Sequence, residues 1–244
     1  MLPTAQSINA KIDLFLMQEF IEECTRFKTR FNDRTFADLS SNRNNLAAIN
    51  AKTIDILKGT YRNTNGSEEI IVDGRPYPVP LSQASTGQQE SIRILQDIFL
   101  SLVDNVPTFK IIEEPEAHLY PKAQKHIVEV LSVSLQNRQS QILITTHSPY
   151  ILSVCNNLLY ARRITNRFEQ LNEAINTIVD AQFWLDPDRF AAFALQNGQV
   201  ESIFNSDIGL IRQNYLDQVF AEMGLEYRRM HSLYAEQITA DQNV

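Results

Sequence analysis

The chain has 244 residues, of which 43% are apolar, and this is enough to build one large α/β domain or two small ones. A composition of this kind excludes a disordered or collagen-like chain. The net charge is −7 and charged residues make up 21% of the chain, so composition gives no support for binding to nucleic acid or to an anionic membrane surface.

The first 58 residues contain no glycine and are predicted to be mostly helical. From Ser7 to Asn32, apolar residues recur every three or four positions, which is typical of one face of a long helix. The residues of this face are Ile8, Ile12, Leu16, Phe20, Cys24, Phe27 and Phe31. A second helical stretch is predicted over residues 36–57.

Short strands are predicted next, where glycines at positions 59, 66 and 74 interrupt the chain. Segments 56–61, 69–72 and 77–81 favour two or three antiparallel strands. From Ser85 onward the pattern changes to alternating helices and strands, as a largely parallel sheet covered by helices requires.

In this alternating region the patterns predict helices at 88–103, 122–135 and 148–157, and strands at 108–112 and 141–145. The predictions for the remaining residues are a strand at 158–162, a helix at 170–179, strands near 189–195 and 200–204, and a final helix at 212–233.

The apolar runs of the chain, such as 98–103 and 142–144, are far shorter than the roughly 20 residues that span a bilayer. Four acidic residues lie between positions 13 and 23, which is unlike a signal peptide. We therefore predict a cytoplasmic protein. The two cysteines, Cys24 and Cys155, lie far apart without metal-ligand spacing, and we expect buried, reduced thiols.

Two of the predicted strands run directly into polar residues. The strand at 108–112 is followed by Glu113 and Glu114, and the strand at 141–145 is followed closely by His147. Since one crossover helix separates these strands, we expect their carboxyl ends to lie side by side, where open α/β sheets bind ligands. A magnesium-associated carboxylate beside a general base would suit the paired acids. Solvated glutamates and a structural histidine are the alternatives.

A third candidate is the small-residue turn Ser85-Thr86-Gly87-Gln88-Gln89, which opens a predicted helix. Ser85 is a natural N-cap, and the N–H groups at a helix start favour an anion. Such turns are common without any ligand. The 244 residues contain neither Gly-x4-Gly-Lys-Ser/Thr nor Gly-x-Gly-x-x-Gly, so they include no glycine loop of the kind that cradles phosphates.

Taken in order, segments 85–89, 109–115 and 145–149 resemble the signature motif, Walker B segment and histidine switch of ABC-like ATPases. They are most similar to AAA-type ATPases related to SMC, RecF and the OLD nucleases. In that group Walker B often reads Glu-Glu-Pro-Glu-x-His-Leu-x-Pro and the switch reads Thr-His-Ser-Pro. Here residues 113–121 read Glu-Glu-Pro-Glu-Ala-His-Leu-Tyr-Pro, and residues 146–149 read Thr-His-Ser-Pro.

The resemblance implies an α/β fold of the P-loop NTPase type. It implies the C-terminal lobe of an ABC/SMC-like domain at 58–244, with a mostly parallel sheet flanked by helices, preceded by a helical arm at 1–57. Glu114 would be the general base for the attacking water, Glu113 would hold Mg²⁺ through water, and His147 would sense the γ-phosphate of ATP. The residues implied to contact ATP across a dimer interface are Ser85, Thr86, Gly87, Gln88 and His118.

Because family members begin with a P-loop, the resemblance further implies that a missing segment or a partner chain supplies one. We expect an ATPase half that uses ATP and Mg²⁺, binds ATP poorly alone, and forms a homodimer or joins a P-loop-bearing half. The apolar face of residues 8–31 should then seek a partner helix. Relatives act in DNA repair, chromosome organisation, phage defence and nuclease control, so a DNA-related or phage-defence process is expected.

Two other functions are open. The chain could be a degenerate ATPase lobe that mediates dimerisation as a non-catalytic adaptor. It could also be an OLD-like metal nuclease that uses Asp186 and Asp188, although the glutamate-glycine strand end that such a site needs upstream is missing.

Overall fold

The computed structural model describes residues 5–40, 44–212 and 222–234 of the chain. Internal contacts divide the chain into two units, Met1–Thr146 and His147–Val244. The boundary predicted between an arm at 1–57 and a lobe at 58–244 concerns a relation to other proteins, and it stays a prediction.

Unit 1 begins with three helices, α1 (Ala5–Arg30), α2 (Phe36–Ser40) and α3 (Asn44–Leu57). Three antiparallel strands follow, β1 (Thr60–Thr64), β2 (Ser67–Ile71) and β3 (Val79–Pro80), with a 3-10 turn η1 (Leu81–Gln83) after them. The helical start and the antiparallel strands that the sequence predicts are therefore confirmed.

An aromatic cluster forms the centre of unit 1. The ring centroid of Phe36 lies 4.7 Å from that of Phe31 and 5.0 Å from that of Phe99, and Tyr61 packs edge-on against Phe31. All four side chains are buried. Because they come from four different elements, the cluster joins the end of α1, α2, β1 and the helix α4 (Thr86–Asp104).

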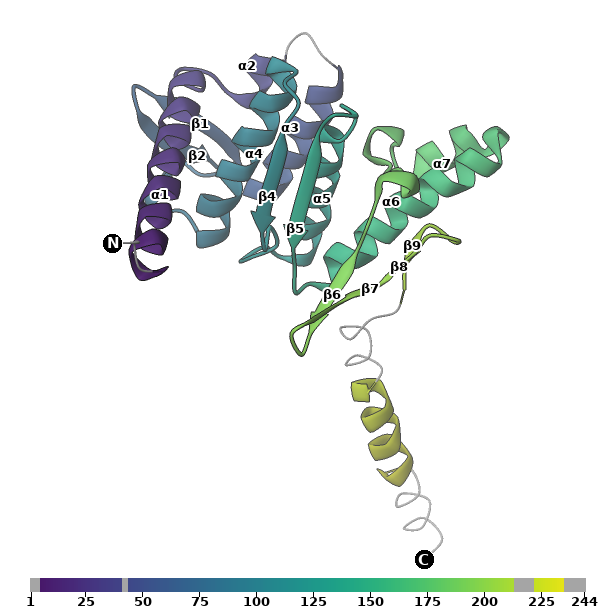
Figure 1. Cartoon of the computed structure of the whole chain (residues 1–244). Helices are drawn as coiled ribbons and strands as arrows, with labels where there is room; N and C mark the ends of the chain where they lie inside the picture. The colour runs from purple at the N-terminus through teal and green to yellow at the C-terminus, as the bar shows by residue number, and fades with distance from the viewer. Residues whose placement is uncertain (1–4, 41–43, 213–221, 235–244) are drawn as a thin grey trace, which may run out of the picture. The chain divides into compact units, whose positions relative to one another are not determined.

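The parallel part of unit 1 consists of β4 (Phe109–Glu113), α5 (Pro121–Ser134) and β5 (Gln141–Thr145). β4 and β5 are parallel neighbours, with Phe109 opposite Gln141 and Glu113 opposite Thr145, as predicted. Figure 1 shows the pair lying against α4 and α5. Within the described residues this sheet has two strands, so the chain shows a mixed α/β fold with a small parallel sheet.

The two faces of the β4–β5 pair have different surroundings. On one face Lys110 donates hydrogen bonds from Nζ to Asp97 and Ser101 of α4, at 2.6 and 2.9 Å. On the other face large apolar side chains are exposed: Phe109 by 66%, Ile111 by 61% and Leu143 by 52%.

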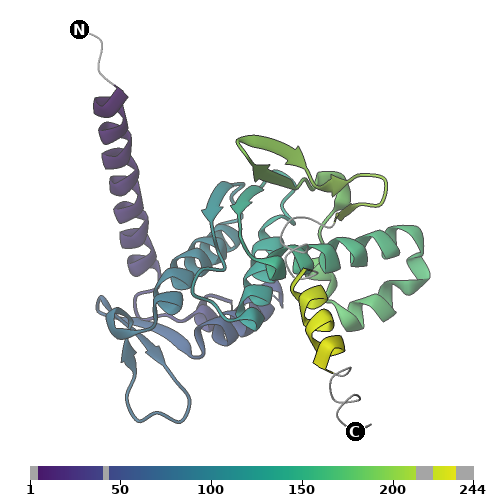
Figure 2. The same ribbon diagram turned by 90° about the horizontal axis from the view of Figure 1, so that it is seen from below.

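The two ends of α1 differ in the same way. Phe27 and Phe31 are buried, whereas the large apolar side chains of the preceding turns are more than half exposed. Figure 2 shows that the N-terminal half of α1 projects beyond the rest of unit 1. The exposed residues are Leu14, Phe15, Leu16, Met17, Phe20 and Ile21.

Unit 2 begins with a long helix, α6 (Pro149–Arg167), followed by η2 (Glu169–Leu171), α7 (Asn172–Ile178), η3 (Ala181–Phe183) and η4 (Pro187–Arg189). Two antiparallel hairpins follow, β6 (Phe193–Gln196) with β7 (Gln199–Ser202), and β8 (Phe204–Asn205) with β9 (Leu210–Ile211). Residues 222–234 are helical, and the first part of the predicted final helix, residues 213–221, lies outside the described residues.

The strand predicted at 158–162 is wrong, because α6 continues through it. The helical spacing of buried residues extends from Ile151 and Cys155 to Leu158 and Thr165, and this face packs in the core of unit 2. The short apolar run at 158–162 is ambiguous in sequence, since a buried helix segment and a buried strand contain the same residue types.

Both cysteines are free thiols. Cys155 is buried, and burial raises the pKa of its thiol to about 12. Cys24 is only half-buried, so the expectation of two buried thiols holds for one of them. Among the described residues, we find no helix with the length and apolar character needed to cross a membrane.

Candidate functional site

The start of α4 is fixed by a capping box. The Ser85 hydroxyl accepts a hydrogen bond from the Gln88 backbone N–H at 3.3 Å, and the Gln88 carboxamide oxygen accepts from the Ser85 N–H at 3.0 Å. Gln88 also donates from Nε2 to the carbonyl oxygen of Leu57 at 2.6 Å. Ser85 is therefore the N-cap that the sequence predicts, and it stands exposed together with Thr86.

Gly87 brings this helix start against the loop that follows β4. A Cβ atom at Gly87 would lie 2.5 Å from the carbonyl oxygen of His118, so the approach requires glycine. The Nδ1 atom of His118 lies 3.0 Å from Oε2 of Glu90, one turn farther along α4. The structure thus places two of the predicted segments, 85–88 and the loop with His118, in direct contact.

The same loop is joined to the end of β5. The backbone N–H of Glu114 donates to the carbonyl oxygen of Thr145 at 3.0 Å, which continues the pairing one residue beyond β4. Glu114 has a φ of 43°, in the left-handed backbone region that residues other than glycine rarely adopt. This backbone conformation costs about 1–3 kcal/mol of folding free energy, and it persists only where the surrounding structure holds it. Both Glu113 and Glu114 are exposed at the carboxyl end of the strand.

A buried carboxylate adds a second link between these segments. The hydroxyl of Thr146 donates to Oε1 of Glu116 at 2.6 Å. Glu116 is only 8% exposed, and Thr146 is half-buried. Sequence reasoning missed this pair, because residues 30 positions apart carry no periodic signal and the contact depends on strand pairing. The sequence offered one indirect signal, which is that Glu116 and Thr146 each lie close to a predicted site residue.

His147 follows Thr146 directly and is the first residue of unit 2. It is exposed, and the next residue, Ser148, caps α6 by accepting a hydrogen bond from the Tyr150 N–H at 3.1 Å. The structure therefore places His147 at the predicted strand-to-helix junction. Its predicted role toward the γ-phosphate stays a prediction.

The carboxylates present could supply one or two of the ligands of a Mg²⁺ ion. Among the described residues no group of three or more His, Cys, Asp or Glu side chains is arranged to hold a metal ion. Mg²⁺ bound with a nucleotide usually takes only one or two carboxylates, together with phosphate oxygens and water. The exposed carboxylates of Glu113 and Glu114 meet that need, and the other ligands would come from the nucleotide and from outside these residues.

One of the two nuclease candidates, Asp186, has a local role. Asp186 caps η4, because its Oδ1 accepts a hydrogen bond from the backbone N–H of Asp188 at 3.1 Å. This capping accounts for Asp186 in the Asp-Pro-Asp turn without a metal.

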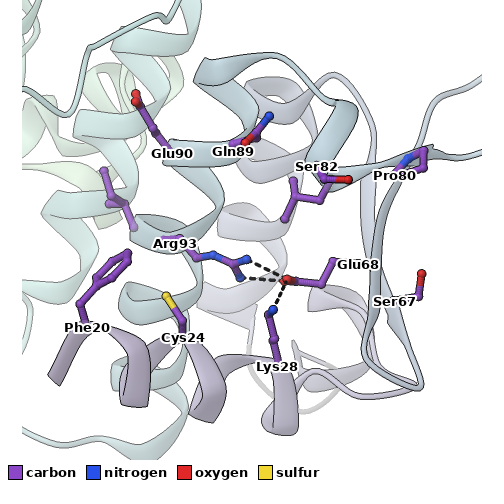
Figure 3. Close-up of a pocket in the computed structure, with 12 residues that line it drawn as sticks. Phe20, Cys24, Lys28, Ser67, Glu68, Pro80, Ser82, Gln89, Glu90 and Arg93 are labelled. Carbon is purple, nitrogen blue, oxygen red and sulfur yellow. Dashed lines mark hydrogen bonds and ion pairs between the residues drawn. The ribbon is translucent and has the colours of Figure 1, made fainter. Parts of the chain in front are cut away.

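A groove of about 800 Å³ lies between α1, β2 and α4, and an ion-pair network forms part of its wall. In Figure 3 Arg93 and Lys28 point toward Glu68, which lies 2.7 and 2.8 Å from the two terminal nitrogens of Arg93 and 3.2 Å from Nζ of Lys28. Tyr61 donates to the same carboxylate at 2.7 Å. Burial raises the pKa of Glu68, but the hydrogen bonds from Arg93 and Tyr61 outweigh it and hold that pKa below its ordinary value.

This network connects three elements around α4 rather than presenting a charged group to a ligand. Glu68 is held by Arg93 and Tyr61, and burial together with the Glu68 carboxylate raises the pKa of the Tyr61 hydroxyl. The groove reaches the start of α4 through Gln89 and Glu90. We therefore interpret it as the structural support of that helix.

The paired acids thus lie at the carboxyl end of a parallel strand, where open α/β sheets bind ligands. Comparison with protein families identifies the class of domain. The model of the family described as "AAA domain, putative AbiEii toxin, Type IV TA system" matches residues 11–153, more than half of the chain. The chain belongs to this AAA-domain family.

A relative among known proteins points to the same group. The chain is 33% identical over 94 residues to an OLD nuclease of Thermus scotoductus. The match covers 38% of this chain and 16% of that nuclease. The matched segment thus spans about a sixth of the length of that relative.

Proposed function

We propose that the chain is the part of an ABC/SMC-like ATPase domain that carries the signature motif, the Walker B segment and the histidine switch. The observation that carries the proposal is the convergence of the α4 start with the carboxyl ends of β4 and β5. Gly87 contacts the His118 backbone, and Glu114 continues the pairing with Thr145. Membership of the AAA-domain family supports ATP and Mg²⁺ as the ligands.

In this proposal the two acids have separate tasks. Glu114 accepts a proton from the water that attacks the γ-phosphate, and Glu113 holds Mg²⁺ through water. Bound Mg²⁺ would offset the charge of the phosphate oxygens. His147 orients or senses the γ-phosphate, as the neutral imidazole can do by hydrogen bonding. All three residues are exposed, which supports this assignment.

The proposed ATPase needs a P-loop that the 244 residues do not contain. We propose that another segment of a longer protein, or a partner chain, supplies it. The support is the exposed apolar face of β4 and β5, because parallel strands are almost always covered on both faces. Glu113 and Thr145 end the strands on that same face, so a covering element would lie close to the carboxylate.

Residues 85–88 and His118 are proposed to act across a dimer interface, on ATP bound by a second subunit. Ser85 and Thr86 are exposed at a capped helix start, where N–H groups and the helix dipole favour a phosphate. The family description and the name of the OLD relative support a process in phage defence or DNA metabolism. A non-catalytic adaptor is the alternative, with the same residues serving dimerisation.

The test is ATP turnover by the full chain combined with its P-loop-bearing partner, comparing Glu114→Gln with the parent. We expect turnover to fall about 100-fold or more, since a general base contributes about 10²–10⁴. Glu173→Gln, at an exposed glutamate of α7, is the matched control and should leave turnover unchanged. Unchanged turnover in Glu114→Gln would overturn the proposed catalysis and favour the adaptor.

A further inference from the structure

We infer that Glu116 and Thr146 form a latch that positions the two loops carrying Glu114 and His147. The inference rests on the proposed function, because positioning matters only if these two side chains act on ATP. We assign both residues a positioning role and no catalytic role. Their contact is a hydrogen bond of 2.6 Å from the Thr146 hydroxyl to a carboxylate that is nearly buried.

The latch lies next to both acting residues. Glu116 is two residues after Glu114, and the buried Pro115 between them has a ring-locked φ. A displacement of Glu116 is therefore transmitted to the backbone of Glu114. On the other side Thr146 directly precedes His147. One hydrogen bond thus joins the turn after Glu114 to the residue that precedes His147.

The left-handed backbone of Glu114 explains why a latch is needed. At a φ of 43° this residue relaxes toward ordinary backbone angles unless its neighbours hold it. Two further hydrogen bonds depend on the same geometry: the Ala117 N–H donates to the Glu114 carbonyl at 2.8 Å, and the Leu119 N–H donates to that of Glu116 at 3.0 Å. Anchoring Glu116 on Thr146 holds this turn against the end of β5.

The chemistry of the pair also suits a latch. A hydroxyl that donates to a carboxylate makes a short, charge-assisted hydrogen bond, which is stronger than one between neutral groups. The burial of Glu116 limits the access of water that would compete for this bond, which strengthens it. The close approach of Gly87 to the His118 carbonyl oxygen brings α4 against the far end of the same loop, so the loop is contacted at both ends.

The first test uses the full chain without nucleotide. In Thr146→Val the hydroxyl is replaced by a methyl group of similar size, and we expect amide hydrogen exchange at Glu114 and Ala117 to become about tenfold faster. Thr146→Ser keeps the donor and should restore slow exchange. Thr177→Val removes a comparable hydroxyl bond in α7 and is the control. Unchanged exchange in Thr146→Val would overturn the latch.

The second test uses ATP turnover in the assembly with the P-loop partner. We expect Thr146→Val to lower kcat about 10- to 100-fold with little change in KM, because binding groups are kept while the reacting groups are misplaced. Thr146→Ser should recover most of kcat. If Glu114→Gln abolishes turnover while Thr146→Val leaves it unchanged, the latch inference fails and the proposed function stands. If Glu114→Gln itself has no effect, the proposed function fails, and the positioning role fails with it.

Discussion

The two faces of the β4–β5 pair contain similar apolar residues but have different surroundings. Ile112 and Ile144 lie on the half-buried face, where Lys110 is tied to α4 through Asp97. Ile111 and Leu143 lie on the face that is more than half exposed. Burying such a side chain fully contributes about 1.5–3 kcal/mol, so the exposed face is a large unused source of stability. The difference supports the proposal that another element covers this face.

The largest expected effect is in the buried aromatic cluster of unit 1. Phe99→Ala should lower the free energy of unfolding by about 3–5 kcal/mol, because the fully buried ring leaves a cavity in the aromatic cluster. Denaturant unfolding of the full chain measures this change. The matched variant on the exposed face is Phe109→Ala, which should change the same quantity by less than about 1 kcal/mol. Equal losses in the two variants would remove the contrast between the faces.

A smaller effect is expected from the ion pair that holds α4 in place. Glu68→Gln should destabilise the chain by about 2–3 kcal/mol at neutral pH, because the guanidinium of Arg93 loses the negative charge of its carboxylate partner. The pKa of Glu68 is lowered in the folded state, so its contribution is present above the ordinary glutamate pKa of about 4.3 and is lost as the pH falls through the lowered value.

Stability measured between about pH 7 and pH 3 should therefore decline more steeply in the parent chain than in Glu68→Gln. Glu69→Gln is the matched control, because Glu69 pairs with Arg62 on an exposed part of the hairpin. Parallel pH profiles for the parent and Glu68→Gln would show that this carboxylate does not stabilise the packing around α4.

The smallest effect on stability is expected on the exposed face itself. Ile111→Ser should change the free energy of unfolding of the chain alone by less than about 0.5–1 kcal/mol, because the side chain is 61% exposed. Binding to the proposed P-loop-bearing partner should weaken, which titration or size-exclusion analysis of the mixture measures. Ile112→Ser, one residue along and on the half-buried face, should instead destabilise the chain alone. A large loss of stability in Ile111→Ser would contradict the comparison.

The sequence predicted the elements of unit 1 well where local signals agree. The helical period of 7–32, the strands at 108–112 and 141–145, and the Ser85 cap all follow from spacing and capping rules that act over a few residues, and the structure agrees to within a residue or two. The prediction at 158–162 failed because a short apolar run has no period of its own, and the buried face of α6 decided its conformation.

The candidate site divides in the same way. The residue types at 85–88, 113–114 and 147 could be selected from sequence, because strand ends and helix starts are local features. No local feature predicted that Gly87 would contact the His118 backbone, that Glu114 would adopt a left-handed backbone, or that Thr146 would bond to Glu116.

The sequence by itself thus determined which elements form and which of them end in chemically active side chains, because hydrophobic period, capping and turn propensity act between near neighbours. The tertiary structure alone decided which ends meet, which face of the sheet is covered and which carboxylate is buried. These depend on strand register and helix packing, which join residues 30 or more positions apart, such as Glu116 and Thr146.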